Sequence, residues 1–321
     1  MKKLLFIVSV AVLFSCEKKE IPVPKPIKGN PGAQTIQAGI GSDYGNQIFY
    51  NCESNTIVKA VNRESWDLGF ESSAAGFHVI LNSGKFMGVV KTNKSNLSEV
   101  TSHSGTEFLY DAPDGNMNAT AIGDWKSENI VYIINMGNTT TGSPIGKYKL
   151  KILSADNEKY QIEYAELSQS TSQLATIQKD SQGTFTYFSM KNNEQVSVEP
   201  PKDTWDICFR TYTHIYPDGM PYLLVGALIN PYQTSVARVN KDFANISYQD
   251  YASASMSTNV DYIGFDWKEY SFETMLYTVD PTKIFVMKTS ANKVYKLHFL
   301  DFYDQTGQKG TTTMEIQEMQ E

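Results

Sequence analysis

The chain has 321 residues, of which 41% are hydrophobic and 12% aromatic, and its formal net charge at pH 7 is −7. This length allows two domains, each large enough to bury a core without disulfide support. Phosphate contacts need clustered Lys and Arg, so the negative charge argues against a nucleic-acid-binding protein.

The N-terminus has the pattern of a lipoprotein signal peptide. A basic start precedes an apolar run over residues 4–14, which is too short to span a bilayer as a mature helix. The run ends in LFSC, which resembles a lipobox, so we expect residues 1–15 to be removed and Cys16 to be lipidated. A plain secretory signal with an incidental cysteine is the alternative. Residues 16–36 contain several prolines and predict a flexible tether between the lipid and the first domain.

One pattern occurs twice along the rest of the chain. WDLGF (66–70) returns as WDICF (205–209), IGDWK (122–126) as IGFDWK (263–268), and YKLKIL (148–153) as YKLHFL (295–300). A spacing this long indicates two copies of a whole domain rather than short repeats. We expect domain one at 37–167 and domain two at 174–321, joined by a polar linker. A residue found in both copies is expected to serve the fold, and a residue found in one copy is the better functional candidate.

Both domains are predicted to be all-β and antiparallel. Short alternating or β-branched runs lie at 130–135, 147–153 and 160–167, and again at 283–289, 293–303 and 311–319. Polar turn segments separate them. No long window has helical periodicity, so we expect only one or two short helices, one of them near Phe243 to Ala254.

The tryptophans are predicted to anchor the cores. Trp66 and Trp205 each begin a run whose alternate residues are apolar, which places those side chains on one sheet face. We therefore expect each tryptophan to belong to the separate core of its own domain. Asp67 and Asp206 follow the tryptophans in both copies and are expected to hydrogen-bond the backbone of a local turn.

The second half of the chain resembles the HmuY family of outer-membrane lipoproteins. The segments that carry the resemblance are TYFSMKNNEQVSV, TWDICF and the C-terminal run from KIFVMKT to GTTTMEI, while domain one has the front of the same pattern. The resemblance implies an all-β fold, a lipid anchor in the outer membrane, exposure at the cell surface, and haem capture beside a TonB-dependent transporter.

The resemblance also indicates where ligands to haem iron would lie. Where the best-known members have a histidine in a W-x-E-F-S-H motif, this chain has Phe272, and the region of the other histidine has none. Met256 and Met275 lie close to the two positions, and a thioether can be an axial haem ligand. Ordinary core or loop methionines are the alternative.

The histidines and cysteines give fewer indications. His214 follows Arg210 and Tyr212 on a polar strand face that could border a pocket, so it is a third cofactor-binding candidate. His298 alternates with apolar residues and is expected on the surface. Cys52 and Cys208 do not occupy equivalent positions in the repeat, so two separate thiols are expected rather than a disulfide.

One group of aromatic residues occurs in a single copy. Tyr212, Tyr216, Tyr222 and Tyr232 lie among prolines, and they predict either an exposed recognition loop or packing beneath a long insertion.

No nucleophile elbow, phosphate-binding loop or dinucleotide fingerprint is present, so no enzyme is predicted. The sequence favours an outer-membrane lipoprotein that captures haem or another small ligand for a TonB-dependent uptake system. An accessory lipoprotein of an outer-membrane complex, without haem, is the second hypothesis.

Overall fold

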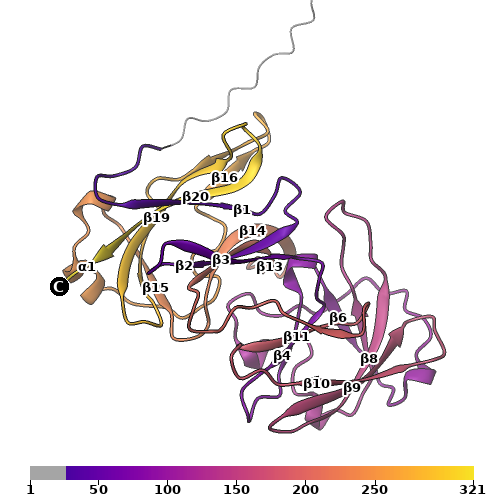
Figure 1. Cartoon of the computed structure of the whole chain (residues 1–321). Helices are drawn as coiled ribbons and strands as arrows, with labels where there is room; N and C mark the ends of the chain where they lie inside the picture. The colour runs from indigo at the N-terminus through magenta and orange to yellow at the C-terminus, as the bar shows by residue number, and fades with distance from the viewer. Residues whose placement is uncertain (1–26) are drawn as a thin grey trace, which may run out of the picture.

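The computed structural model describes residues 27–321, which form two β lobes lying side by side (Figure 1). The predicted signal peptide, Cys16 and most of the tether lie outside this range. All the pairings between its strands are antiparallel, which confirms the all-β prediction. The one α-helix in this range, α1 (Tyr248–Ala252), lies in the predicted place.

The C-lobe consists of two sheets that enclose one core. The first sheet has the order β1 (Gln34–Gly39), β20 (Lys309–Met319), β19 (Val294–Tyr303), β18 (Ile284–Lys288), β15 (Ser235–Val239). The second has the order β14 (Pro221–Ile229), β13 (Ile207–Ile215), β2 (Asn46–Asn51), β3 (Thr56–Asn62). Side chains from both sheets, such as Ile48, Phe209 and Leu297, fill the space between them. A hairpin of β16 (Lys268–Ser271) and β17 (Leu276–Val279) lies beside β19.

The N-lobe repeats this plan. Its first sheet has the order β10 (Gln173–Gln178), β9 (Lys159–Glu166), β8 (Lys147–Ala155), β7 (Tyr132–Asn135), β6 (Gly88–Lys91). Its second has the order β12 (Glu194–Val196), β11 (Phe185–Ser189), β4 (Leu68–Glu71), β5 (Val79–Leu81). Its connections contain the short 3-10 turns η1 (Ser83–Lys85), η2 (Leu97–Glu99), η3 (Met117–Ala119) and η4 (Trp125–Ser127), whereas η5 (Phe243–Asn245) packs on β19 of the C-lobe. Phe70, Ile134 and Tyr160 lie in the core of this lobe.

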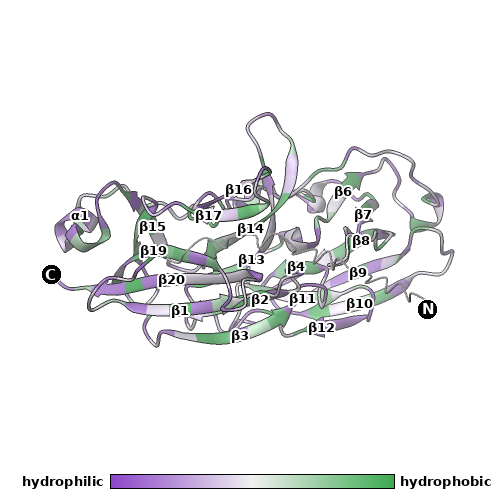
Figure 2. Ribbon diagram, turned by 90° about the horizontal axis from the view of Figure 1, so that it is seen from above, coloured by the Kyte–Doolittle hydropathy of each residue, from purple (hydrophilic) through white to green (hydrophobic). Residues whose placement is uncertain are grey.

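Some strands pair across the predicted ranges 37–167 and 174–321 rather than within them. Strand β2, from the first half of the chain, pairs with β13, and Ile207 lies opposite Tyr50. Strand β11, from the second half, pairs with β4, and Phe188 lies opposite Leu68. The repeats therefore exchange strands, and each lobe contains segments of both. In Figure 2 the two four-stranded sheets lie in the middle, with the five-stranded sheets at either end.

The two aspartates of the WD motifs hold this exchange together. Asp206 Oδ2 accepts a hydrogen bond of 2.7 Å from the backbone N–H of Cys52, just after β2. Asp67 Oδ2 accepts the equivalent bond of 2.7 Å from Met190, just after β11. The prediction of a bond to a local turn was therefore wrong, because the N–H donor comes from the other repeat.

The prediction of one separate tryptophan core per domain was also wrong. Trp66 and Trp205 belong to a single buried cluster between the lobes, together with Phe49, Val198 and Cys208. Trp267 lies in the core of the C-lobe and Trp125 in the core of the N-lobe, as expected of separate cores. The strand exchange explains the difference, because it brings the starts of β4 and β13 to the junction.

His298 is buried, although a surface position was predicted. Its Nε2 lies 2.6 Å from Glu315 Oε2, and its ring stacks on Phe243 with centroids 4.5 Å apart. The segment from η5 to α1 covers this face of β19, so residues on both faces of the strand are buried. Alternation within the strand could not reveal a cover supplied by a distant loop.

The lysine of each DWK motif lies over aromatic rings. Lys268 Nζ is 4.2 Å from the Trp267 ring centroid and 4.7 Å from that of Phe302, and it donates to the Val225 carbonyl at 2.6 Å. Burial lowers the pKa of Lys268 to about 7. Lys126, its counterpart, lies 4.4 Å from the Phe77 ring centroid but is exposed. The motif is shared, but only the second copy encloses the cation.

Candidate functional site

A cavity of about 650 Å³ lies at the junction of the two lobes. We call it the interlobe cavity. One wall comes from β2 and β13, where Phe49, Cys208 and Arg210 point away from the C-lobe core. The opposite wall comes from β5 and β11, and the loops 111–117 and 258–260 form the rim. The volume lies in the range of small-molecule sites, about 300 to 1,000 Å³.

Aromatic side chains give the cavity much of its apolar surface. Trp66 packs edge-on against Tyr187 with ring centroids 4.7 Å apart, and Trp205 packs edge-on against Phe49 at 5.0 Å. These two pairs occupy matching positions in the two repeats. Edge-to-face pairs stabilise the packing of the rings and hold their planes in fixed directions. The cavity therefore offers rigid, flat surfaces to a ligand.

Arg210 supplies a cation to the wall. Its Nε donates to the Thr211 carbonyl at 3.0 Å, and its guanidinium lies 5.6 Å from the Trp66 ring centroid. Within residues 27–321, no carboxylate forms a salt bridge with it. Burial lowers the pKa of Arg210, but a guanidinium stays protonated at any physiological pH. The wall thus has an unpaired positive charge.

Several buried polar atoms of the lining lack a hydrogen-bond partner among the described residues. They include both amide atoms of Gln47, the indole N–H of Trp66 and the hydroxyl of Tyr212. All three side chains are at least 98% buried. Buried polar groups are nearly always paired in folded proteins, so atoms of this kind indicate a ligand or ordered water in the cavity.

Glu199 lies at a different part of the wall. Its Oε2 accepts from the backbone N–H of Thr184 at 3.1 Å, and the hydroxyl of Tyr187 lies 3.4 Å from the same oxygen. Burial raises the pKa of Glu199, although the backbone N–H groups of Thr184 and Phe185 oppose the shift. The neutral form is therefore favoured more than in water, and Glu199 does not pair with Arg210.

The rim is fixed by a second carboxyl group, that of Asp111, which is half-buried. Asp111 accepts hydrogen bonds from the backbone N–H of Leu81 at 2.7 Å and of Ala121 at 2.8 Å. Burial raises the pKa of Asp111 to about 6. The two backbone donors favour the charged form, so at neutral pH this group ties the loop 111–117 to β5.

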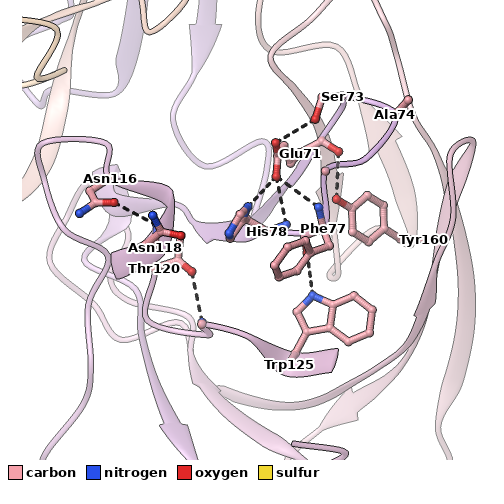
Figure 3. A network of polar contacts seen from close by, with 12 residues as sticks. Glu71, Ser73, Ala74, Phe77, His78, Asn116, Asn118, Thr120, Trp125 and Tyr160 are labelled. Atoms are coloured by element: carbon pink, nitrogen blue, oxygen red, sulfur yellow. Dashed lines mark hydrogen bonds and ion pairs between the residues drawn. The ribbon is translucent and has the colours of Figure 1, made fainter. Parts of the chain in front are cut away.

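Glu71 also lines the cavity, but its carboxylate is occupied (Figure 3). Its Oε2 lies 2.6 Å from His78 Nδ1, and its Oε1 accepts from the Ser73 hydroxyl at 2.9 Å. The same network continues to the N-lobe core, where Trp125 Nε1 donates to the Phe77 carbonyl at 2.6 Å. Glu71 therefore fixes the β4–β5 turn and leaves no oxygen free for a ligand.

A second cavity, of about 780 Å³, lies in the N-lobe. Its lining includes several charged side chains, among them the buried ion pair of Lys85 with Asp67. The Lys147 ammonium, also in the lining, donates to the His103 carbonyl at 3.0 Å. Two of its cations thus have partners, and Tyr148 is its one aromatic residue apart from His103, so it suits an apolar ligand less well.

The three predicted cofactor-binding residues lie in different places. Met256 is half-buried and packs with Tyr248 and Tyr251 in the cluster that includes α1. Met275 is 64% exposed at the tip of the β16–β17 hairpin, and Phe272 beside it is 85% exposed. His214 lies at the end of β13, with its Nδ1 3.8 Å from Asp261 Oδ2. None of them lines the interlobe cavity. A haem-ligating role for them stays a prediction.

Some tyrosines of the single-copy group are exposed, as a recognition loop requires, and one is packed in the interior. Tyr212 is buried in the cavity wall, whereas Tyr216 and Tyr222 are exposed around the β13–β14 turn. Cys52 and Cys208 are separate buried thiols, as predicted.

Sequence reasoning missed Arg210 as a site residue. The signal was present, because WDLGFE in the first repeat becomes WDICFR in the second, so Arg210 replaces Glu71 in one copy only. Met117, a thioether in the cavity rim, was also missed, because it lies in a loop without a motif.

Two negative observations apply to residues 27–321. No group of three or more His, Cys, Asp or Glu side chains gathers there in a way that could hold a metal ion. No helix in that part of the chain has the length and apolar character needed to cross a membrane.

Comparison with known proteins gives a family match. The family model described as HmuY protein matches residues 43–186 and 181–316. A search of curated proteins gave no match.

Solved structures with similarity to the chain share little sequence with it. Apo PinO from Porphyromonas gingivitis is 9% identical, with a TM-score of 0.26 over 91% of this chain and 99% of that one. A Bacteroides vulgatus structure described as HmuY-like and haem-binding is 12% identical, with a TM-score of 0.25 over 91% and 95%. The apo HmuY analogue of Tannerella forsythia is 7% identical, with a TM-score of 0.27 over 93% and 99%. These TM-scores are low, so the family assignment rests on the sequence match.

Proposed function

Because the chain belongs to the HmuY family, we propose that it captures a small ligand in the interlobe cavity, with haem as the leading candidate. The role is binding rather than catalysis. The observation that carries the proposal is the cavity itself, in which rigid aromatic side chains, an unpaired guanidinium and unpaired buried polar atoms surround one space. Sites for small molecules combine apolar walls with a few polar groups in this way.

The lining fits the porphyrin of haem better than its iron. Trp66, Trp205 and Tyr187 suit a flat apolar body, and Arg210 suits a carboxylate. A bound haem would supply an iron centre that accepts a thioether, a thiolate or a phenolate as axial ligand. Burial raises the pKa of Cys208 to about 12, so its thiol stays protonated, and burial raises the pKa of Tyr187 as well. Met117 is then the lining residue best suited to the iron.

Haem titration tests the proposal. Two tryptophans line the cavity, so bound haem is expected to quench the protein's fluorescence and to shift the Soret band in at least one oxidation state. Ile80→Trp places a large side chain in the cavity wall and should weaken binding at least tenfold. Ile57→Trp, on an exposed face of β3, is the matched control and should bind normally. Equal binding by both variants would place the ligand elsewhere.

The proposal includes an anchor at Cys16 in the outer membrane and uptake through a TonB-dependent transporter at the cell surface. Labelling with a clickable fatty acid in an expressing Gram-negative host should mark the wild type but not Cys16→Ser. Cys52→Ser, which removes a buried thiol, is the control and should be labelled normally. A labelled Cys16→Ser protein would rule out the anchor.

A second candidate function is docking to another outer-membrane protein. Exposed apolar side chains at two hairpins favour it, namely Phe272 and Met275 on one and Met220 and Tyr222 on the other. A photocrosslinker at Phe272 should then link to one defined membrane protein, while a crosslinker at the exposed Leu174 of β10 should not. The same pattern of products at both positions would argue against docking at the hairpins.

A further inference from the structure

We propose that Arg210 recognises a carboxylate on the captured ligand, so the interlobe cavity selects flat apolar acids and does not require iron. This deepens the proposed function and rests on it for the place of binding. The ligand class is an aromatic or porphyrin-like body that bears at least one carboxylate.

Arg210 occupies the position in the second repeat that Glu71 occupies in the first. Its counterpart, Glu71, forms hydrogen bonds with His78 and Ser73. Arg210 forms no ion pair with any of residues 27–321 and faces the cavity. The shared position therefore stabilises a turn in one repeat and presents a charge to the cavity in the other.

Apart from the Nε bond to Thr211, the described residues hold the guanidinium of Arg210 only by long contacts at its Nη2 atom. Its Nη2 lies 3.3 Å from the Ser83 hydroxyl and 3.4 Å from Asn82 Oδ1, both long for a hydrogen bond. No described residue accepts from its Nη1 in these contacts. An arginine presents five N–H donors in a fixed plane, which matches the two oxygens of a carboxylate. Arg210 thus keeps donors available for a second, stronger partner.

The cavity wall contains buried hydrogen-bond donors and acceptors that have no partner among the described residues. The indole N–H of Trp66 and the hydroxyl of Tyr212 are buried donors without partners, and the Gln47 amide can also donate. The wall also contains two buried acceptors without partners, Gln47 Oε1 and Glu199 Oε1. Glu199 forms no ion pair with Arg210, and its Oε2 accepts from the backbone N–H groups of Thr184 and Phe185 instead. A negatively charged group is therefore the complement of the part of the wall around Arg210 and Trp66.

The apolar surface of the cavity is formed in large part by two pairs of aromatic rings. The Trp66–Tyr187 and Trp205–Phe49 pairs hold their rings rigidly on either side of the junction. Flat ligands gain contact with such rings at little entropic cost, because the rings are already ordered. An acid with a planar apolar body therefore matches both the charge and the walls.

The test compares a metal-free porphyrin acid with its ester. Protoporphyrin IX should bind the wild type, followed by its own fluorescence, and its dimethyl ester should bind roughly 10- to 100-fold more weakly. Arg210→Gln should lose a similar factor for the acid and little for the ester, and Arg210→Lys should keep part of the affinity. Arg238→Gln makes the same charge change on an exposed face of β15 and should bind the acid normally. Thermal melts check that each variant is folded.

The outcomes separate this inference from haem capture. Equal affinity of the wild type for acid and ester would overturn it without any variant, and haem capture would stand. If no porphyrin binds, 2-naphthoate and neutral 2-naphthamide are compared by calorimetry. Binding of the naphthoate alone, lost in Arg210→Gln, would keep the carboxylate site and remove haem as the ligand. Failure of every probe would overturn both proposals.

Discussion

The two copies of the WD motif differ in what their last residue does. In the first copy Glu71 is fixed by His78 within a turn, and in the second Arg210 faces the interlobe cavity without an ionic partner. The aspartates of both copies make the same bond to a strand of the other repeat. Positions that the copies share therefore maintain the exchange of strands, and positions that differ create the site.

The largest loss of stability is expected from a substitution at the junction where the two repeats meet. Trp205→Ala should cost about 3 to 5 kcal/mol, because it removes a buried ring from the cluster that Trp66 also occupies. Since that cluster joins the lobes, both should become sensitive to protease together. Trp125→Ala, in the core of the N-lobe alone, is the comparison. A stable N-terminal fragment from the Trp205→Ala protein would show that the lobes unfold independently.

The two aspartates should differ in the cost of their removal. Asp67→Asn leaves the buried Lys85 without its anion, which typically costs about 3 to 5 kcal/mol. Asp206→Asn weakens the bond to the Cys52 N–H and strands no cation, so about 1 to 3 kcal/mol is expected. Urea denaturation of both variants measures the difference. Equal losses would mean that the Lys85 pair adds nothing to the first copy.

The lysines of the two DWK motifs should respond differently to pH. Burial lowers the pKa of Lys268 to about 7 in the fold, whereas an unfolded lysine has a pKa near 10.4. Between these values the unfolded state binds more protons, so the stability of the fold should rise with pH from about 7 to 10, by up to about 1.4 kcal/mol per unit. Below pH 7 this contribution no longer changes.

Urea midpoints of the wild type and of Lys268→Met at several pH values isolate this contribution. The difference between the two proteins should change over that range, and Lys126→Met, at the exposed counterpart, should follow the wild type. A constant difference across the range would contradict the lowered pKa of Lys268.

The smallest effect on stability is expected at the exposed tip of the β16–β17 hairpin. Phe272→Ser and Met275→Ala change side chains that are 85% and 64% exposed, so the free energy of unfolding should change by no more than about 0.5 kcal/mol. If Met275 is a haem ligand, the Soret spectrum should change in its variant although stability does not. An unchanged spectrum in both would clear this hairpin of a role in haem binding.

Local structure was predictable from the sequence because it depends on local patterns. The runs at 147–153 and 293–303 became β8 and β19, and the helix near residue 250 became α1. The repeat motifs also predicted two equivalent halves. These features rest on alternation, turn residues and self-similarity, all of which are visible in one segment at a time.

The exchange of strands could not be predicted in this way. Strands β2 and β11 are both short and rich in aromatic residues, and each pairs antiparallel with the strand that follows a WD motif of the other repeat. Which partner is taken depends on the whole chain. The buried state of His298 was missed for a similar reason, because its cover comes from the segment between η5 and α1.

The pairing of β1 with β20 determines when the C-lobe sheet can be completed during folding. Gln34 pairs with Ile316, so the edge of the C-lobe sheet closes only when nearly the last residues are present. Contacts so distant in sequence form slowly, because a long loop must close first. A chain that emerges from its N-terminus would keep this sheet incomplete until β20 is available. Until then β1 and the edge of β19 that β20 covers would stay unpaired, and unpaired edges of this kind are prone to aggregation.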